Sequence, residues 1–331
     1  MIYMRRAASA TLALTFLAAS LHAQKPNKRT EIVPPAGYKP LALAESSELR
    51  TILASSISEI TASRFKPNEI AATLIDLHDP RNLRWANVNG EQALYPASVV
   101  KMFYMVALHR QLEDKKVTLT KELERGLRDM IVDSSNEATQ YILDVLTDTS
   151  SGAELPKREF DEWQFKRNRV NRYLSAMGYT GINVNQKTFC EDAYGIEQQS
   201  RNYKGENRNM LTTNATARML AEIVLGHVAM PERTRAMMDL MKRDPWKGTA
   251  DMDDRSTGFI GRALLEKQIA GARLWSKAGW TSRSRHEAAY VELPDGRKLV
   301  LVIFTENHAT ARELIPTIAG RVIDKLGGKE L

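Results

Sequence analysis

Residues 95–112, with the sequence YPASVVKMFYMVALHRQL, carry the strongest pattern in this chain. The proline cannot continue a preceding helix, so a helix is predicted to begin just after it and to run over residues 99–112. Ser98 falls in or near the first turn, and Lys101 follows on the same helical face. A serine hydroxyl is a poor nucleophile until a base removes its proton, and a buried lysine can act as that base. The stretch therefore predicts a helix that carries a serine nucleophile and its base.

Two further short strings follow this helix in order along the chain. Ser134-Ser135-Asn136 comes at the end of an amphipathic segment, residues 119–132, and Lys277-Ala278-Gly279 lies on a predicted strand that starts at residue 274. Each string alone has a structural explanation, as a helix cap, a turn or a solvated lysine. Three strings in order, each on the expected kind of element, point to an active-site serine acyl-transfer enzyme.

The patterns on both sides of these strings predict an α+β fold. Helical periodicity is present over residues 45–63, 99–112, 119–132, 160–177, 215–228, 233–242 and 309–326. Strands are predicted at residues 70–77, 83–88, 274–277, 287–293 and 298–305. Residues 182–210 show no sustained period and are predicted to be a long loop. The order implies a three-layer α/β/α sandwich, with a helical subdomain at about residues 98–260 inserted between the sheet-forming segments.

The N-terminal residues have the features of an export signal. Met4-Arg5-Arg6 is positively charged, and residues 7–21 form an apolar run that is too short to span a bilayer comfortably. We predict a signal peptide over residues 1–23, which implies a periplasmic or secreted protein; an uncleaved anchor helix is the alternative. Residues 24–44 are predicted to be a linker, and residues 45–331 a single domain.

Composition excludes several other classes of protein. The formal net charge of +7 is modest, and the densest basic run, residues 166–172, is expected to be a solvated helix face, so no nucleic-acid partner is predicted. Cys190 is the only cysteine, which leaves no internal disulfide. The six histidines show no ligand spacing, so neither a metal nor a cofactor is expected. The protein is expected to be a monomer.

The three strings resemble the motifs of the class A β-lactamase and penicillin-binding-protein superfamily of serine enzymes. Asp295-Gly296 in the last hairpin and the helix start at Thr212-Thr213 add to this resemblance, which covers roughly residues 45–328. It implies a five-stranded antiparallel sheet flanked by helices, beside an all-helical subdomain, with the site between them. It also implies a β-lactam or a cell-wall peptide as the substrate.

The resemblance further implies roles for the residues that match the motifs. Ser98 would be acylated, Lys101 would be the base, and Ser134 would pass a proton to the leaving nitrogen. The backbone N–H groups of Ser98 and Trp280 would form the oxyanion hole. The substrate-binding residues would be Asn136, Lys277, Gly279, Trp280 and Arg285, with Arg283 as a rival to Arg285 for the substrate carboxylate.

Two departures from the family pattern leave the reaction open. The interval between Ser98 and Ser134 is shorter than the family usually shows, and the E-x-x-L-N motif, whose glutamate activates water for deacylation, is missing. Glu191, Glu197 and Glu206 lie in the long loop, and Glu197 is the best placed of them. The size and layout favour a β-lactamase, whereas the missing motif favours a penicillin-binding or D,D-peptidase-like protein that deacylates slowly. A catalytically silent scaffold that binds cell-wall peptide or a protein partner is the third hypothesis.

Overall fold

The computed structural model describes residues 30–61, 65–189 and 192–328. The helices are α1 Ser47–Thr61, α2 Lys101–Glu113, α3 Lys121–Arg128, α4 Asn136–Thr147, α5 Lys157–Arg167, α6 Arg169–Ala176, α7 Gly195–Arg201, α8 Thr213–Val224, α9 Pro231–Met241, α10 Ile260–Glu266 and α11 Leu314–Leu326. The strands are β1 Ala44–Glu45, β2 Ile70–Asp76, β3 Arg84–Val88, β4 Lys242–Arg243, β5 Arg273–Trp280, β6 Arg285–Glu292 and β7 Lys298–Thr305. The export signal predicted for residues 1–23 lies outside the described residues.

One sheet organises the described part of the chain, in the order β1-β3-β2-β7-β6-β5-β4. The five longer strands β3, β2, β7, β6 and β5 are antiparallel to their neighbours, which confirms the predicted five-stranded antiparallel sheet. The two-residue strands β1 and β4 extend its edges, and β1 runs parallel to β3. The α+β fold class is therefore the one that the pattern of elements predicts.

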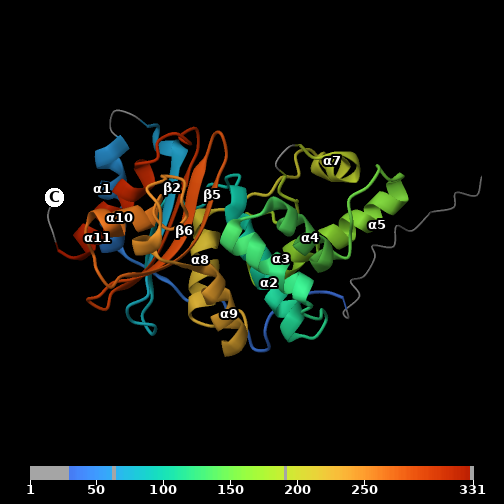
Figure 1. Ribbon diagram of the computed structural model, residues 1–331, viewed down its shortest axis with the longest axis horizontal. Coiled ribbons are helices and arrows are strands. Elements are labelled where there is room, and N and C mark those ends of the chain that lie inside the picture. Colours follow the sequence, from blue (N-terminus) through green and yellow to red (C-terminus); the bar gives the residue numbers. More distant parts are fainter. Residues whose placement is uncertain (1–29, 62–64, 190–191, 329–331) are drawn as a thin grey trace, which may run out of the picture. The chain divides into compact units, whose positions relative to one another are not determined.

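Alternation along the strands divides the core into two clusters. On β2, Ala71 and Ile75 belong to the cluster shared with the helical part, whereas Ala72 and Leu74 pack with α1, α10 and α11. The helices α1, α10 and α11 thus cover one face, and α8 lies against the other through β2, β6 and β7 (Figure 1). Beyond α8, α2 is buried almost all round and contacts α4, α6 and α9, so it forms the centre of the helical part.

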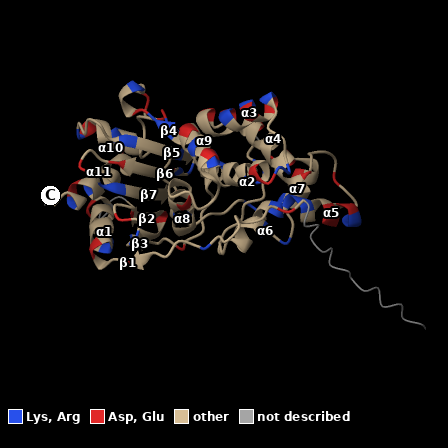
Figure 2. Ribbon diagram, turned by 90° about the horizontal axis from the view of Figure 1, so that it is seen from below, with Lys and Arg blue, Asp and Glu red and all other residues tan. Residues whose placement is uncertain are grey.

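Several predicted elements differ in detail from those observed. The single helix expected over residues 160–177 is two helices, α5 and α6, which meet at Asn168. The predicted loop 182–210 contains the short helix α7. The basic run 166–172 is not a solvated face, because Arg167 is fully buried in an ion pair with Glu197. Both basic and acidic residues are present along α3 and α5 (Figure 2).

The segment 32–44 is packed on the domain, so its prediction as a linker is wrong. Ile32 is buried in the core, and the Tyr38 hydroxyl donates a hydrogen bond of 2.8 Å to the carboxylate of Glu222. Glu222 is itself completely buried and also accepts from the Tyr179 hydroxyl at 2.8 Å. Because a buried carboxylate needs such partners, the domain begins near Ile32 rather than at residue 45.

The core contains a histidine whose titration should make the fold sensitive to acid. His109 on α2 is buried, and neither ring nitrogen has a hydrogen-bond partner among the described residues. Burial, with a smaller contribution from Arg233, lowers the pKa of His109 to about 4. The folded pKa lies below the unfolded value, so protonation favours unfolding, and stability is lost as the pH falls from about 6.5 towards 4.

His109→Leu should therefore reduce the acid sensitivity of folding. Between pH 7.5 and pH 4.5, the free energy of unfolding of this variant should fall by roughly 2 kcal/mol less than that of the wild type. Urea unfolding at the two pH values measures this difference, with the exposed His227→Gln as the matched control. An equal fall in His109→Leu and the wild type would contradict the assignment.

Within residues 30–61, 65–189 and 192–328, no helix combines the length and apolar character needed to cross a bilayer.

Candidate active site

Ser98 lies in a turn of 3₁₀-helix, Ala97–Val100, that leads directly into α2. The backbone N–H of Lys101 donates to the Ser98 carbonyl, so the two residues are one helical turn apart, as predicted. Ala97, just before the serine, has a φ of 46°, a left-handed conformation that is uncommon for a residue other than glycine. Such local strain concentrates at functional sites, where the surrounding structure enforces it.

His286 on β6 holds the chain that precedes the serine. The backbone N–H of Thr305 donates to His286 Nδ1 at 3.1 Å, so the ring proton is on Nε2, which donates to the Tyr95 carbonyl at 2.9 Å. Burial lowers the pKa of His286 to about 4, which keeps the ring in this neutral form. Strands β6 and β7 therefore fix the position of the loop that carries Ser98.

Gly279 allows β5 to approach the start of α2 closely. A Cβ atom at this position would lie 2.6 Å from the Ser98 nitrogen and 2.9 Å from the Val99 nitrogen, closer than real Cβ atoms come. The absence of a side chain therefore brings the strand backbone against the nucleophile turn. Trp280, whose N–H group is predicted to share an oxyanion hole with that of Ser98, is the next residue on this strand.

Lys101 is completely buried, and the second sequence string surrounds its amine. Its Nζ donates to the Ser134 carbonyl, to the Ser135 carbonyl at 3.2 Å and to Asn136 Oδ1 at 2.9 Å. Ser134 has a φ of 58° at the end of a π-helical turn, a feature that is frequent at functional sites. The structure thus brings together three of the predicted site residues, Lys101, Ser134 and Asn136.

Lys277 on β5 reaches the same serine from the other side. Its Nζ donates to Ser134 Oγ at 2.8 Å, while Lys101 Nζ lies 3.4 Å from that oxygen. Burial comes first among the causes that hold the pKa of Lys277 well below its usual range, followed by the positive charges of Lys101, Arg243 and Arg255. Two buried amines therefore share one hydroxyl, and this arrangement can move a proton between them.

Glu197 is engaged in a buried ion pair. It is almost completely buried, and its two carboxylate oxygens accept from Arg167 at 2.6 and 2.8 Å. Burial alone would raise the pKa of Glu197, but Arg167 and Lys187 outweigh it and hold the pKa below its usual value. Among the described contacts, Glu197 has none with Ser98 or Lys101. Its ion pair instead ties the long loop to α5.

Of the other two loop glutamates, only Glu206 is among the described residues. Glu206 lies at the surface, 3.0 Å from the Arg208 guanidinium. Glu191 and Cys190 are outside the described residues. Among the residues that are described, no group of histidine, cysteine, aspartate and glutamate has the arrangement of a metal site.

Arg285, predicted as a second anchor for the substrate carboxylate, is paired with groups of the protein itself. Its guanidinium donates to Asp253 at 2.6 Å and to the Gly258 carbonyl at 3.1 Å, and its Cζ stacks 3.9 Å from the centroid of the Phe259 ring. Because these partners leave Arg285 almost completely buried, binding a substrate carboxylate would require it to leave Asp253. Its rival Arg283 is exposed on the turn after β5.

Three residues of the site region carry no sequence motif. Arg243 donates to the Ile131 carbonyl at 3.1 Å, and Arg255 lies 5.5 Å from the centroid of the Trp280 ring. Both arginines act on the charge of Lys277, and His286 positions the nucleophile loop. Sequence analysis did not identify these three residues, because they are distant from the motifs along the chain and only the packing of the strands brings them close to the site.

Comparison with known proteins finds a matching family and similar solved structures. The sequence profile of the beta-lactamase enzyme family matches residues 52–126 and 122–326. A search of curated proteins finds no match. The crystal structure of beta-lactamase from Sphaerobacter thermophilus DSM 20745 is similar, with a TM-score of 0.62 and 19% sequence identity over 85% of this chain and 99% of that chain.

The structure of PBP-A is also similar, with a TM-score of 0.60 and 18% identity over 88% of this chain and 100% of that chain. A mutant of PBP-A, determined as an acyl-enzyme complex with penicillin G, has a TM-score of 0.60 and 18% identity over 86% of this chain and 98% of that chain. At this identity, the likeness establishes the fold.

Proposed function

The chain belongs to the beta-lactamase enzyme family, and on that premise we propose that it is a serine hydrolase that takes the acyl group of a β-lactam onto Ser98 and releases it to water. The observation that carries the proposal is the Ser134 hydroxyl, which lies within hydrogen-bond reach of both Lys101 and Lys277. Lys101, one helical turn from Ser98, would be the base for the nucleophile, and Ser134 the proton donor for the leaving group.

The acylation step follows from these contacts. Ser98 Oγ attacks the β-lactam carbonyl carbon, and its proton passes to the unprotonated amine of Lys101. The backbone N–H groups of Ser98 and Trp280 stabilise the oxyanion, which is worth about 3 kcal/mol for one such donor in other hydrolases. The carbon–nitrogen bond then breaks, and the ring nitrogen takes the Ser134 Oγ proton, which Lys101 replaces. Asn136 holds Lys101 in place, and Lys277 attracts the substrate carboxylate.

A second candidate is a penicillin-binding or D,D-peptidase-like protein that is acylated in the same way and deacylates slowly. The ion pair of Glu197 with Arg167 favours it, because this carboxylate is already satisfied and cannot easily activate water. The proposal of a β-lactamase therefore requires that another group, or water placed by Lys101, performs the deacylation. We also propose that the protein acts as a monomer outside the cytoplasm, which the basic and apolar N-terminal residues support.

Nitrocefin tests the first step and separates the two candidates. The wild type should hydrolyse at least one equivalent of nitrocefin, and Ser98→Ala should hydrolyse none while remaining folded by circular dichroism. Sustained hydrolysis beyond one equivalent supports the β-lactamase, whereas a burst of one equivalent followed by almost nothing, with the adduct on Ser98 by mass spectrometry, supports the slowly deacylating protein. If the folded wild type gives neither hydrolysis nor an adduct, the proposal is wrong and the silent scaffold is favoured.

A further inference from the structure

The outer edge of β5 is open beside the proposed site. β4 pairs with β5 only at Trp275 and Leu274, and no described strand pairs with the edge from Lys277 to Trp280. An extended ligand can add to such an edge as an antiparallel strand. If its carboxylate end lies at Lys277, its acyl end runs past Trp280 towards the turn between β5 and β6.

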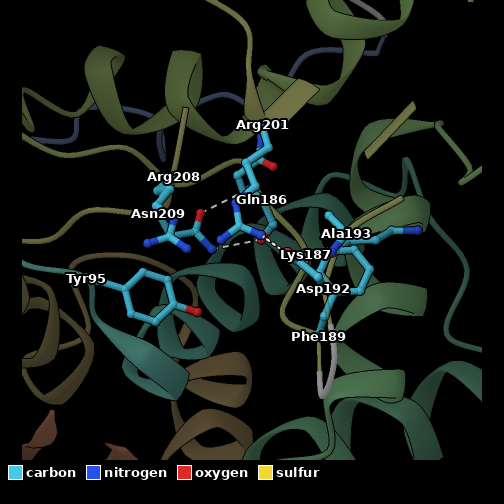
Figure 3. A pocket seen from close by; sticks show the side chains of 9 residues that line it. All are labelled: Tyr95, Gln186, Lys187, Phe189, Asp192, Ala193, Arg201, Arg208 and Asn209. Carbon is cyan, nitrogen blue, oxygen red and sulfur yellow. Dashed lines mark hydrogen bonds and ion pairs between the residues drawn. The ribbon is translucent and has the colours of Figure 1, made fainter. Parts of the chain in front are cut away.

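A pocket of about 250 Å³ lies where that acyl end would arrive. Its lining includes Thr281 and Arg283 from the turn, and Tyr95 and Arg208 from the opposite side, with Glu306 as the acidic residue among the described lining. A second pocket of about 110 Å³ shares Tyr95 and Arg208 with the first (Figure 3). Tyr95 precedes the nucleophile turn, so both pockets adjoin the loop that carries Ser98.

Arg208 is the residue that gives this region its chemical character. Its Cζ lies 5.6 Å from the centroid of the Tyr95 ring, and the two side chains point towards one another (Figure 3). Its Nε lies 3.0 Å from Glu206, a side chain that is 71% exposed, so this ion pair is weakened by water. The two terminal nitrogens of Arg208 donate to no described residue. A guanidinium held over an aromatic ring, with its two terminal donors unused, is suited to a carboxylate.

The other basic side chains that line the two pockets have partners within the protein. In the smaller pocket, Arg201 pairs with Asp192, and buried Lys187 donates to Asp144 at 2.6 Å. In the larger pocket, Arg283 donates to Asn307 at 2.9 Å. Of these cations, Arg208 is therefore the one that both pockets share and that keeps donors for a ligand.

We propose that Arg208, supported by the Tyr95 ring, is a specificity-determining residue that selects acyl donors with a carboxylate on the acyl side. The assignment rests on the proposed function, since it concerns the acyl group that Ser98 receives. It commits the site to a substrate class with two carboxylates, one near Lys277 on the leaving side and one near Arg208 on the acyl side.

Carbenicillin and benzylpenicillin test the assignment, because they differ only by a carboxyl group on the acyl chain. The second-order rate constant for acylation, measured by stopped flow or by competition with a fluorescent penicillin, should be about fivefold to tenfold higher for carbenicillin in the wild type. In Arg208→Gln this ratio should fall to about one, and Arg208→Lys should retain part of it. Arg158→Gln, which removes an arginine that is 93% exposed on α5, should leave both rate constants unchanged.

The outcomes distinguish a failure of the role assigned to Arg208 from a failure of the proposed function. If benzylpenicillin acylates the wild type but carbenicillin is no faster, or if Arg208→Gln keeps the preference, the role of Arg208 is wrong while the acyl-enzyme stands. If Arg158→Gln lowers the ratio as much as Arg208→Gln, overall charge causes the preference, and the local site is also rejected. If neither compound acylates folded protein, the proposed function fails first.

Discussion

Alanine in place of Lys101 should slow the acylation of Ser98 by roughly 100- to 10,000-fold, the usual contribution of a general base. The variant keeps the serine, the turn that carries it and the backbone N–H groups of the proposed oxyanion hole. It removes the amine that is proposed to receive the hydroxyl proton and to recharge Ser134, so both proton transfers of the proposed step are affected. Rates of labelling with a fluorescent penicillin, measured over a range of concentrations, give the effect directly.

A control must separate chemistry from folding in this variant. Lys101→Ala leaves the Ser134 and Ser135 carbonyls and Asn136 without their buried donor, and each unsatisfied group costs about 1–3 kcal/mol of stability. Labelling should therefore be measured well below the midpoint of thermal unfolding of the variant. Lys121→Ala, at an exposed position on α3, serves as the matched lysine substitution. Equal labelling rates for the wild type and Lys101→Ala would reject Lys101 as the base.

Gly279→Ala should reduce acylation by roughly 100-fold or more, although it adds a single methyl group. The new Cβ would meet the backbone nitrogens of Ser98 and Val99 at 2.6 and 2.9 Å, so either β5 or the nucleophile turn must move. Such a shift would separate the two N–H groups of the proposed oxyanion hole, and the loss of one donor costs about 100- to 1,000-fold in turnover in other hydrolases. Acylation kinetics and a thermal unfolding curve should be measured together.

Gly152→Ala is the matched control for the glycine substitution, because a Cβ at Gly152 meets no atom within 4 Å. It should be labelled at the wild-type rate. Gly279→Ala should retain the secondary structure of the wild type by circular dichroism and lose only the fast acylation. Wild-type acylation by folded Gly279→Ala would mean that the strand and the turn are not held as closely as the structure has them.

Local signals in the sequence predicted the parts of the site that local geometry determines. Ser98 and Lys101 share a helical turn, so their relation follows from helical spacing alone. Runs of β-forming residues separated by turns predicted the strands, and the resemblance implied their five-stranded antiparallel arrangement. The second and third strings were then placed beside Lys101 by resemblance, and the structure brings Ser134 and Lys277 into contact with each other.

The sequence did not reveal partners that are distant along the chain. Glu197 is near the expected place along the chain, but nothing in the loop indicates that Arg167 on α5 will neutralise it. Arg285 follows the correct strand, yet its pairing with Asp253 depends on how the segment before α10 folds back. The same applies to Tyr38, whose packing against Glu222 turned a predicted linker into part of the domain. The charge pattern of a short segment does not identify ion-pair or hydrogen-bond partners that are distant in sequence.

The position of β7 in the sheet also governs when the protein can fold. β7 lies between β2 and β6, and its residues pair with β2 from Ile70 with Thr305 to Asp76 with Leu299. During synthesis, β2 therefore emerges long before the strand that completes it, and the growing chain carries an unpaired, apolar strand edge that can template aggregation. Pairing of β2 with β7 closes the long loop of chain between them, which makes folding slow. The sheet can therefore form only when nearly the whole chain has been synthesised. The nascent chain thus remains unfolded, and accessible to chaperones, for most of its synthesis.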